Sequence, residues 1–519
     1  MDETKHDAKI GAFVLETLTL GMYRNPLDSL REYIQNAFDS IRAAERERVL
    51  AVGAGRIEIH TDDKNKSVII RDNGLGIPAD AIGNRLVDVG MSEKSLETDA
   101  GFRGIGRLAG MTYCKRLIFR TQGVGEKVVS SIEFDAVELK KAMSPSERRV
   151  RLLPEVLKEC SKIDITPSRE NVSFFEVEMA DLENQGKEFL KRSVLKDYLE
   201  QVAPLGLDTH SFAMSARFYE WLDRHEIEMP TVSIVMKNGA NSYELFKPYR
   251  QITYSTIKNN DKIHVRDIKF FPEDAGPNSP FWIWYADTNC PGAFRKEEVG
   301  GFRLRKANIG IGFYERMDEI FREASESYGR LNRYFMGEVH IQSPGVIPNG
   351  LRDGFEDTEE WNAIRAQLVG FAHERSREVH ALSQGRNADI EKLAGAANKL
   401  LKKTKKKEET GLASKAERDK LIKEHEKQIG KLEKAVKGNR EESEKQRLNN
   451  KVLDLINSAK RLSSRNNYTS ARLNASLDRK QKKVISEIIE ILYEKIDKKS
   501  FAIAQKAILE KYQMTKKAK

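Results

Sequence analysis

The 519-residue sequence has no long apolar run and only three cysteines. Nowhere do ~18 consecutive apolar residues occur, so no transmembrane helix is expected. The first ten residues, MDETKHDAKI, are polar and contain no apolar signal core, which favours a protein that stays in the cytoplasm. Cys114, Cys160 and Cys290 lie far apart without CxxC spacing, so they are expected to be reduced and structural, and a zinc site is not expected.

After Leu382 the sequence also lacks proline and is almost free of aromatic residues. Of the 89 Lys+Arg and 79 Asp+Glu in the chain, residues 386–519 hold 36 and 19, a balance of +17 against +10 for the whole chain. The rest of the chain is therefore acidic. This asymmetry favours a polyanionic partner for the tail, with nucleic acid first. A solvated helical tail with surplus lysines remains the alternative.

Three domains are expected from the order of apolar patterns. Residues 1–205 mix helices with hairpin-like strands, as in an α+β sandwich, and lack strict βαβ alternation. Residues 206–383 follow as a second α/β domain, with strands in TVSIVMKNG, KIHVRDIKFF and FWIWYADT. Trp282 and Trp284 share one face of the last of these strands and are expected in the core. Residues 384–519 form a helical, coiled-coil-like tail.

Within the tail, Ile422, Ile429 and Val436 recur every seven residues, which predicts a short coiled-coil seam that could hold a dimer. Glycines at 411 and 438 interrupt the pattern, so we expect helices that fold back or pair between chains. The apolar helix over 483–496 should pack against another element. The lysine run is the expected contact with nucleic acid, through Lys402, Lys403, Lys405, Lys406 and Lys407.

A helix predicted from about Leu27 to Leu50 carries a polar stripe. Its segment REYIQNAFDS has apolar residues at packing spacing, yet Glu32, Asn36 and Asp39 recur at i, i+4 and i+7. That spacing places a carboxylate, an amide and a second carboxylate on one face of the helix. Taken alone, such a pattern is typical of surface polarity, so its meaning depends on the rest of the chain.

Two glycine-rich segments further along suit a nucleotide. In RDNGLGIP (71–78), Asp72 lies at a strand end and can accept a hydrogen bond from the exocyclic amine of adenine. Gly74 and Gly76 allow the backbone to approach the base and sugar. In GFRGIGRLAG (101–110), three glycines can turn backbone N–H groups toward phosphate at a helix N-terminus; they are Gly101, Gly104 and Gly106.

The side chains of the polar stripe also suit a nucleotide with its metal ion. The side-chain oxygen of Asn36 is a hard ligand for a Mg²⁺ ion that bridges phosphates. Glu32, one turn earlier, is placed to orient or deprotonate a water for attack on the terminal phosphate. The three segments together therefore predict a nucleotide site.

In this order and spacing the segments resemble the GHKL superfamily of ATPases. That superfamily includes DNA gyrase B subunits, the ninety-kilodalton heat-shock chaperones, and MutL, MORC and sensor histidine kinase proteins. LREYIQNAFDSI is similar to the family's N box, IIRDNGLGIP to its first glycine box, and GFRGIGRLAG to its second, with GFRG similar to MutL. The resemblance covers about residues 10–180 and implies the α/β sandwich called the Bergerat fold.

The resemblance also implies cofactors and residue roles. ATP and Mg²⁺ are the expected cofactors, with Glu32 as general base, Asn36 as magnesium ligand and Asp72 as adenine reader. Asp39 would lie on the nucleotide side of the helix. Residues of the second glycine box would also contact the nucleotide: Gly101, Phe102, Arg103, Gly104, Ile105 and Gly106.

Between the glycine boxes the family has an ATP lid, which corresponds here to about residues 79–101. When the lid closes, Ser92, Lys94 and Ser95 could contact phosphate. For Lys94, a solvated lysine remains the alternative.

The second domain offers a further catalytic residue. GEVHIQSPGVIPNGLRDGFED (337–357) resembles the chaperone loop that sends an arginine to the γ-phosphate, although its spacing is P-N-G-L-R. That resemblance makes Arg352 the candidate. Lys306 is a rival, and Arg303 and Arg305 are also possible.

These expectations amount to a Mg²⁺-dependent ATPase that works as a homodimeric clamp. Its target stays open between nucleic acid, as for MORC and MutL proteins in bacterial genome maintenance or antiviral defence, and protein clients, as for heat-shock chaperones. The basic tail favours the first and the Arg352 loop favours the second. A partner protein encoded nearby is a further possibility. A topoisomerase or a MutL-type nuclease is not expected, because the acidic and tyrosine motifs of those enzymes are missing downstream.

Overall fold

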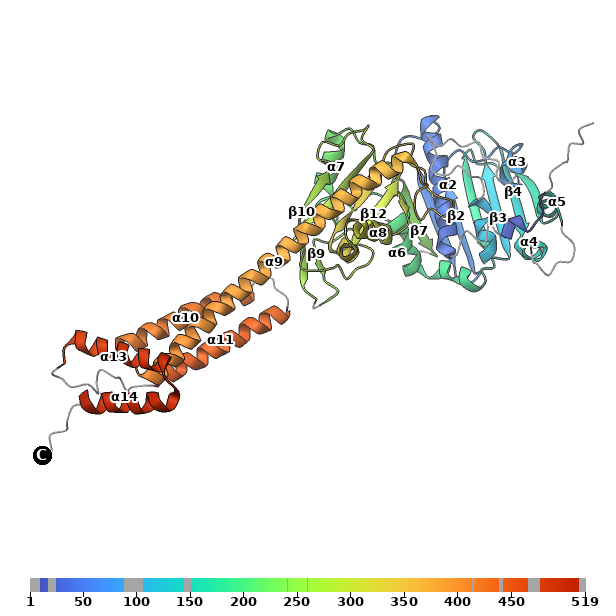
Figure 1. The fold of residues 1–519 in the computed structure, drawn as a ribbon. Coiled ribbons are helices and arrows are strands. Elements are labelled where there is room, and N and C mark those ends of the chain that lie inside the picture. The colour runs from blue at the N-terminus through green and yellow to red at the C-terminus, as the bar shows by residue number, and fades with distance from the viewer. Residues whose placement is uncertain are drawn as a thin grey trace, which may run out of the picture. The chain divides into compact units, whose positions relative to one another are not determined.

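The computed structural model describes residues 10–16, 25–87, 106–143, 151–239, 241–258, 260–412, 415–437, 442–464 and 477–512. The chain divides into two compact units, residues 1–255 with 263–376 and residues 256–262 with 377–519. The first unit is mixed α/β and the second is mainly helical (Figure 1). The predicted fold class is confirmed.

The first unit contains an eight-stranded sheet with the order β5-β4-β3-β6-β2-β1-β7-β8. Most neighbours are antiparallel, and only β1 and β7 run parallel among them. The strands are β1 (Arg56–Asp62), β2 (Ser67–Asp72), β3 (Arg116–Gln122), β4 (Val128–Asp135), β5 (Ser161–Pro167), β6 (Phe174–Ala180), β7 (Ser233–Asn238) and β8 (Asn241–Glu244).

The hairpin-like strands expected in residues 1–205 are present, as the antiparallel pairs β1–β2 and β3–β4. One strand differs from expectation: β7, which covers most of TVSIVMKNG, pairs with β1 of the first sheet. Parallel pairing needs a long crossover connection, and a local apolar pattern does not reveal which distant strand it will join. The expected boundary at residue 205 therefore lies ahead of a strand that belongs to the first sheet.

Helix α2 (Pro26–Arg46) lies against β1 and β2 of this sheet (Figure 1). It starts where Asn25 caps it, with the Asn25 side chain accepting from the Leu27 N–H at 3.1 Å, and Pro26 occupies the first turn. The other elements of this layer are α1 (Val14–Glu16), α3 (Ile82–Val87), η2 (Gly106–Tyr113), α4 (Ala136–Met143), α5 (Leu153–Glu159), η3 (Asn184–Leu190) and α6 (Arg192–Val202).

A second sheet of the same unit has the order β13-β12-β14-β11-β10-β9. Trp282 and Trp284 on β11 are 1% and 0% exposed and pack with Phe218, so their predicted core role is confirmed. The elements are α7 (Ser215–Arg224), β9 (Thr253–Ser255), β10 (Lys262–Phe271), β11 (Phe281–Thr288), β12 (Gly301–Lys306), β13 (Ile309–Ile311), α8 (Glu315–Ala324), η4 (Glu326–Tyr334) and β14 (Met336–Ile341).

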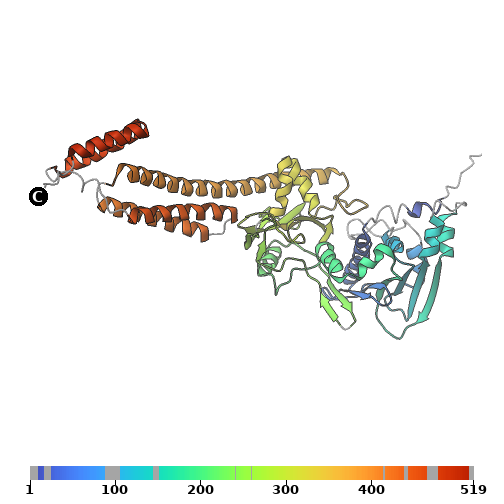
Figure 2. The ribbon, with the colours of Figure 1, turned by 90° about the horizontal axis from the view of Figure 1, so that it is seen from below.

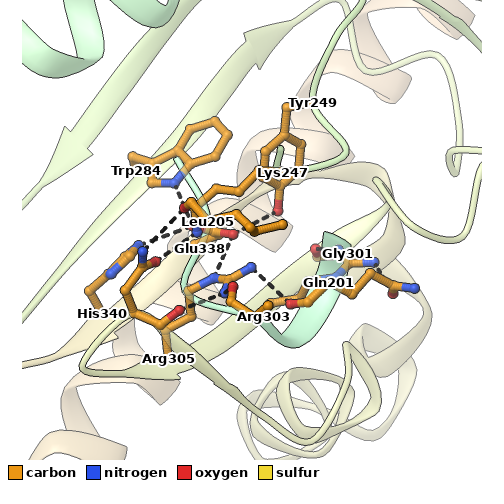
Figure 3. A network of polar contacts seen from close by, with 12 residues as sticks. Gln201, Leu205, Lys247, Tyr249, Trp284, Gly301, Arg303, Arg305, Glu338 and His340 are labelled. Atoms are coloured by element: carbon orange, nitrogen blue, oxygen red, sulfur yellow. Dashed lines mark hydrogen bonds and ion pairs between the residues drawn. The ribbon is translucent and has the colours of Figure 1, made fainter. Parts of the chain in front are cut away.

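A buried polar network centres on Glu338 of β14 (Figure 3). Its carboxylate accepts from Lys247 Nζ at 2.8 Å, from Tyr249 and Trp284 at 3.3 Å each, and lies 2.6 Å from Arg305 Nε. Burial lowers the pKa of Lys247 to about 7, with the Arg305 charge adding to the effect. Because β14 leads directly into the loop that carries Arg352, this network fixes one end of that loop.

The second unit is built from helices that fold back along α9 (Figures 1 and 2). Helix α9 (Glu359–Thr410) contributes residues to both units. The remaining helices are α10 (Lys415–Lys437), α11 (Glu442–Ser463), α13 (Arg479–Lys495) and α14 (Lys498–Tyr512). Helices α9, α10 and α11 share a core made of the apolar side chains Ile390, Ala397, Leu432, Leu448, Val452 and Leu455.

The expected dimer seam is used inside this bundle. Ile429 and Val436 pack against the core formed by α9, α10 and α11, and Ile422 packs beside Leu421 and Leu462. All three side chains are half-buried against helices of the same chain, and the pairing of two chains through this seam stays a prediction.

The apolar helix near the end of the chain also has a partner. Ile485 and Ile489 of α13 pack against Phe501 of α14, which confirms the expectation for 483–496. Within the described ranges, no helix is both long and apolar enough to cross a membrane.

Candidate functional site

The polar stripe of α2 is largely buried. Glu32 and Asp39 are 8% and 4% exposed, and Asn36 between them is half-buried. The Glu32 carboxylate Oε1 accepts from Arg352 Nε at 2.6 Å. The structure thus brings together two of the residues predicted to be catalytic, although they are 320 positions apart.

Gly106 of the second glycine box lies against the same carboxylate. A Cβ added to Gly106 would be 2.5 Å from Glu32 Oε2, so only glycine fits there without moving Glu32. Tyr33, next to Glu32, fixes this approach: its hydroxyl donates to the Arg107 carbonyl at 2.9 Å and accepts from the Gly110 N–H at 2.8 Å. Helix α2 therefore holds the first turn of η2 in place.

Asp72 is buried at the end of β2, and its Oδ1 accepts from the Gly74 N–H at 2.8 Å. That bond sets the orientation of the carboxylate. The loop that follows is bound to α2, because the Leu75 N–H donates to Ser40 Oγ at 3.1 Å. It is bound to β3 as well, because the Ile77 N–H donates to Thr121 Oγ1 at 2.7 Å.

The glycines of this loop are required by the protein's own packing. A Cβ at Gly74 would lie 2.2 Å from Ser40 Oγ. Gly76 has φ +66°, and a Cβ there would lie 2.1 Å from the Gln122 carbonyl oxygen. Close approach to a base and sugar was the reason expected from the sequence; close approach to α2 and β3 is the reason that the structure gives.

Sequence reasoning missed Ser40 and Thr121, which hold the Asp72 loop. Ser40 follows Asn36 by four residues, so the spacing of the polar stripe could have included it. Thr121 gave no comparable signal, because a threonine near a strand end is common.

The Arg352 loop is attached to the site from two sides. The guanidinium of Arg31, beside Glu32 on α2, donates to the carbonyls of Leu351 at 3.0 Å and Arg352 at 3.3 Å. The Gly312 N–H, which follows β13, also donates to the Arg352 carbonyl, at 2.9 Å. Arg352 has φ +53°, an unfavourable conformation for a non-glycine residue, so these contacts hold a strained backbone in place.

The other basic residues considered for the γ-phosphate bind backbone carbonyls of the protein. Lys306 donates to the backbone carbonyls of Gln342 and Ser343, and burial lowers its pKa to about 8. Arg303 donates to carbonyls at 297, 300 and 301, and Arg305 to carbonyls at 201, 203 and 308. Of these residues and Arg352, it is Arg352 that contacts Glu32.

Seven of the predicted nucleotide contacts lie outside the described residues: Lys94, Ser95, Gly101, Phe102, Arg103, Gly104 and Ile105. Ser92 lies there too.

Residues 25–164 match the sequence model of a family described as "Histidine kinase-, DNA gyrase B-, and HSP90-like ATPase". The matched range contains α2, the Asp72 loop and η2. This part of the chain is a GHKL-type ATPase domain. No curated protein matches the sequence.

ATP is the nucleotide that this domain family binds, and Mg²⁺ accompanies it there. In the part of the chain that the structure describes, no group of three or more His, Cys, Asp or Glu residues could hold a metal by itself. Mg²⁺ commonly takes one or two protein ligands and completes its coordination with phosphate oxygens and water. Asn36, half-buried on the stripe with Glu32, fits that arrangement.

Proposed function

We propose that the chain hydrolyses ATP with Glu32 as the general base and Arg352 as the residue that stabilises charge on the transferred phosphoryl group. The supporting observation is the 2.6 Å contact between Arg352 Nε and Glu32 Oε1, beside the first turn of η2. General-base groups and phosphate-directed arginines act within hydrogen-bonding distance of the same reacting atoms.

In this mechanism Glu32 takes a proton from the water that attacks the γ-phosphorus, and the bond to the ADP oxygen breaks. Arg352 donates to the phosphoryl oxygens as their negative charge redistributes. Asn36 would hold Mg²⁺, which neutralises phosphate charge when bound. Asp72 accepts from the adenine amine, and Asp39 lines the nucleotide side of α2.

Glu32→Ala tests this assignment. Hydrolysis should fall by ~10²-fold or more while ATP binding stays near that of the unmodified protein, because Glu32 acts on water. Phosphate release and calorimetric ATP binding measure the two effects. Normal hydrolysis by the variant would contradict the assignment.

We also propose that the ATPase drives a homodimeric clamp on nucleic acid in the cytoplasm. The +17 balance of residues 386–519 supports a polyanionic target for the tail. The competing function is an ATP-dependent chaperone, which is favoured by the contact between the chaperone-like Arg352 loop and Glu32.

Two measurements separate these functions. A non-hydrolysable ATP analogue should pair N-terminal domains, seen by sizing as a doubled mass or, for a dimer held elsewhere, as compaction. Duplex binding that falls steeply with salt supports the nucleic-acid clamp. Suppression of client aggregation by ATP, without binding of nucleic acid at low salt, would instead support the chaperone.

A further inference from the structure

The solvent face of α10 carries a row of lysines. Lys420, Lys423, Lys427, Lys431 and Lys434 are all exposed. Among the described residues, none of the five has an ion pair or a side-chain hydrogen bond, whereas many other lysines of the chain do. Their charges therefore face solvent with no carboxylate partner in the part of the chain that the structure describes. We call this row the α10 lysine stripe.

Helix geometry concentrates these charges. At 3.6 residues per turn the five side chains occupy an arc roughly 80° wide and, at 1.5 Å per residue, about 21 Å long. No acidic residue falls within that arc. The nearest are Glu424 and Glu417, which pair with Lys403 and Lys407 at 2.8 Å each, and Asp419, which pairs with Arg418 at 3.0 Å.

The orientation of the stripe is set by the opposite face of α10. Leu421, His425 and Leu432 on that face are buried. His425 contacts Ser458 Oγ at 3.2 Å through Nε2, which adds a buried polar pair between α10 and α11. Buried polar residues in helix bundles favour one register and rotation, so the stripe stays directed outward.

The lysine run at 402–407 differs from the stripe, although it is denser in the sequence. Lys403 pairs with Glu424, Lys406 with Glu494, and Lys407 with Glu417, each at 2.8 Å. Three of the five lysines expected to contact nucleic acid thus have carboxylate partners within the tail. Paired charges release fewer counterions on binding a polyanion than solvated charges do.

We infer that the α10 lysine stripe binds the phosphate backbone of duplex nucleic acid. This inference rests on the proposed function, in which the tail engages nucleic acid. A row of charges about 21 Å long spans roughly a dozen phosphates of a duplex, which carries one charge per ~1.7 Å. Such contacts read no bases, so binding is independent of sequence.

Two other polyanions fit the stripe less well. Helices that bind membrane surfaces pair a basic face with an exposed apolar one, and α10 has no exposed large apolar side chain. Single-stranded nucleic acid is commonly bound by stacking on aromatic rings, and neither α10 nor α11 contains an aromatic residue. Binding to a duplex backbone needs the basic charges of the stripe, but neither an exposed apolar face nor aromatic rings.

A matched pair of full-length variants tests the inference. The stripe variant carries Lys423→Gln, Lys427→Gln, Lys431→Gln and Lys434→Gln. The control carries the same four-charge change on α9, at four exposed lysines that have no ion pair among the described residues: Lys392→Gln, Lys399→Gln, Lys402→Gln and Lys405→Gln. Glutamine has nearly the helix propensity of lysine, so circular dichroism should show equal helicity.

The readout is duplex affinity over a range of salt concentrations. Losing four phosphate contacts should weaken binding by roughly 10²-fold or more at low salt and reduce the slope of log affinity against log salt by roughly 3 to 4. The control should keep most of the affinity and slope. Equal or greater loss in the control would overturn the stripe assignment and favour α9.

Other outcomes are distinguishable. If the stripe variant binds the duplex as tightly as the unmodified protein does, the assignment of the stripe is wrong. The proposed nucleic-acid function is not contradicted by that result. No duplex binding by the unmodified protein at low salt overturns that function itself. Tighter binding of single strands, or binding of vesicles with anionic lipids in place of the duplex, would assign the stripe to a different partner and overturn the inference.

Discussion

Replacing Arg352 with methionine should abolish most ATP hydrolysis and destabilise the first unit. The side chains of Arg352 and Glu32 are 9% and 10% exposed, so the variant leaves a carboxylate buried without its 2.6 Å partner. Breaking a buried ion pair on one side costs about 3–5 kcal/mol. An arginine that stabilises a phosphoryl transition state contributes ~10³-fold or more to kcat, equivalent to about 4 kcal/mol.

Arg316→Met is the matched control. Arg316 on α8 pairs at 2.7 Å with Asp353, the neighbour of Arg352, but both side chains are about a third or more exposed. An exposed pair of this kind contributes about 0–1 kcal/mol, so the control should keep nearly full kcat and stability. It also shows whether disturbing the loop at an adjacent residue is enough to lose activity.

The assay combines single-turnover hydrolysis with a double-mutant cycle. Glu32→Gln, Arg352→Met and the double variant are unfolded in urea, and the coupling free energy is obtained from the three changes in unfolding free energy. A direct ion pair predicts coupling above 1 kcal/mol, with the double variant more stable than additivity implies. Additive destabilisation together with normal hydrolysis by Arg352→Met would refute the proposed role of this contact.

Three further changes test other parts of the first unit. Asp72→Asn should weaken ATP binding in calorimetry by ~10-fold or more, because an amide offers a poorer acceptor to the adenine amine; unchanged affinity would argue against the adenine pocket. Gly106→Ala should lower kcat but leave the fold intact by circular dichroism, because its Cβ would displace Glu32 Oε2 from a position 2.5 Å away. Lys306→Met should flatten the pH dependence of stability measured by urea unfolding at pH 7.5 and 9.5. The folded-state pKa of Lys306 is about 8 against an ordinary value of 10.5, so the unfolded state binds more protons between these values and unfolding free energy rises with pH there. An equal slope in the variant would mean that Lys306 does not carry this effect.

Much of the first sheet could be predicted from the sequence because its interactions are local. The β1–β2 and β3–β4 hairpins join neighbouring segments, and Asn25 and Pro26 mark the start of α2. The stripe of Glu32, Asn36 and Asp39 followed from helical periodicity alone. The lysine run at 402–407 was equally visible, but its ion pairs were not, because their acidic partners lie on α10 and α13.

Only the tertiary structure decided which of several basic residues reaches Glu32. Arg303, Arg305, Lys306 and Arg352 all follow plausible patterns, but packing commits the first three to backbone carbonyls or buried carboxylates. Packing likewise determines which lysines form the α10 lysine stripe. The seven-residue spacing on α10 predicted a packing face, but only the burial around His425 and Leu432 and the ion pairs of neighbouring lysines show which lysines remain in solvent.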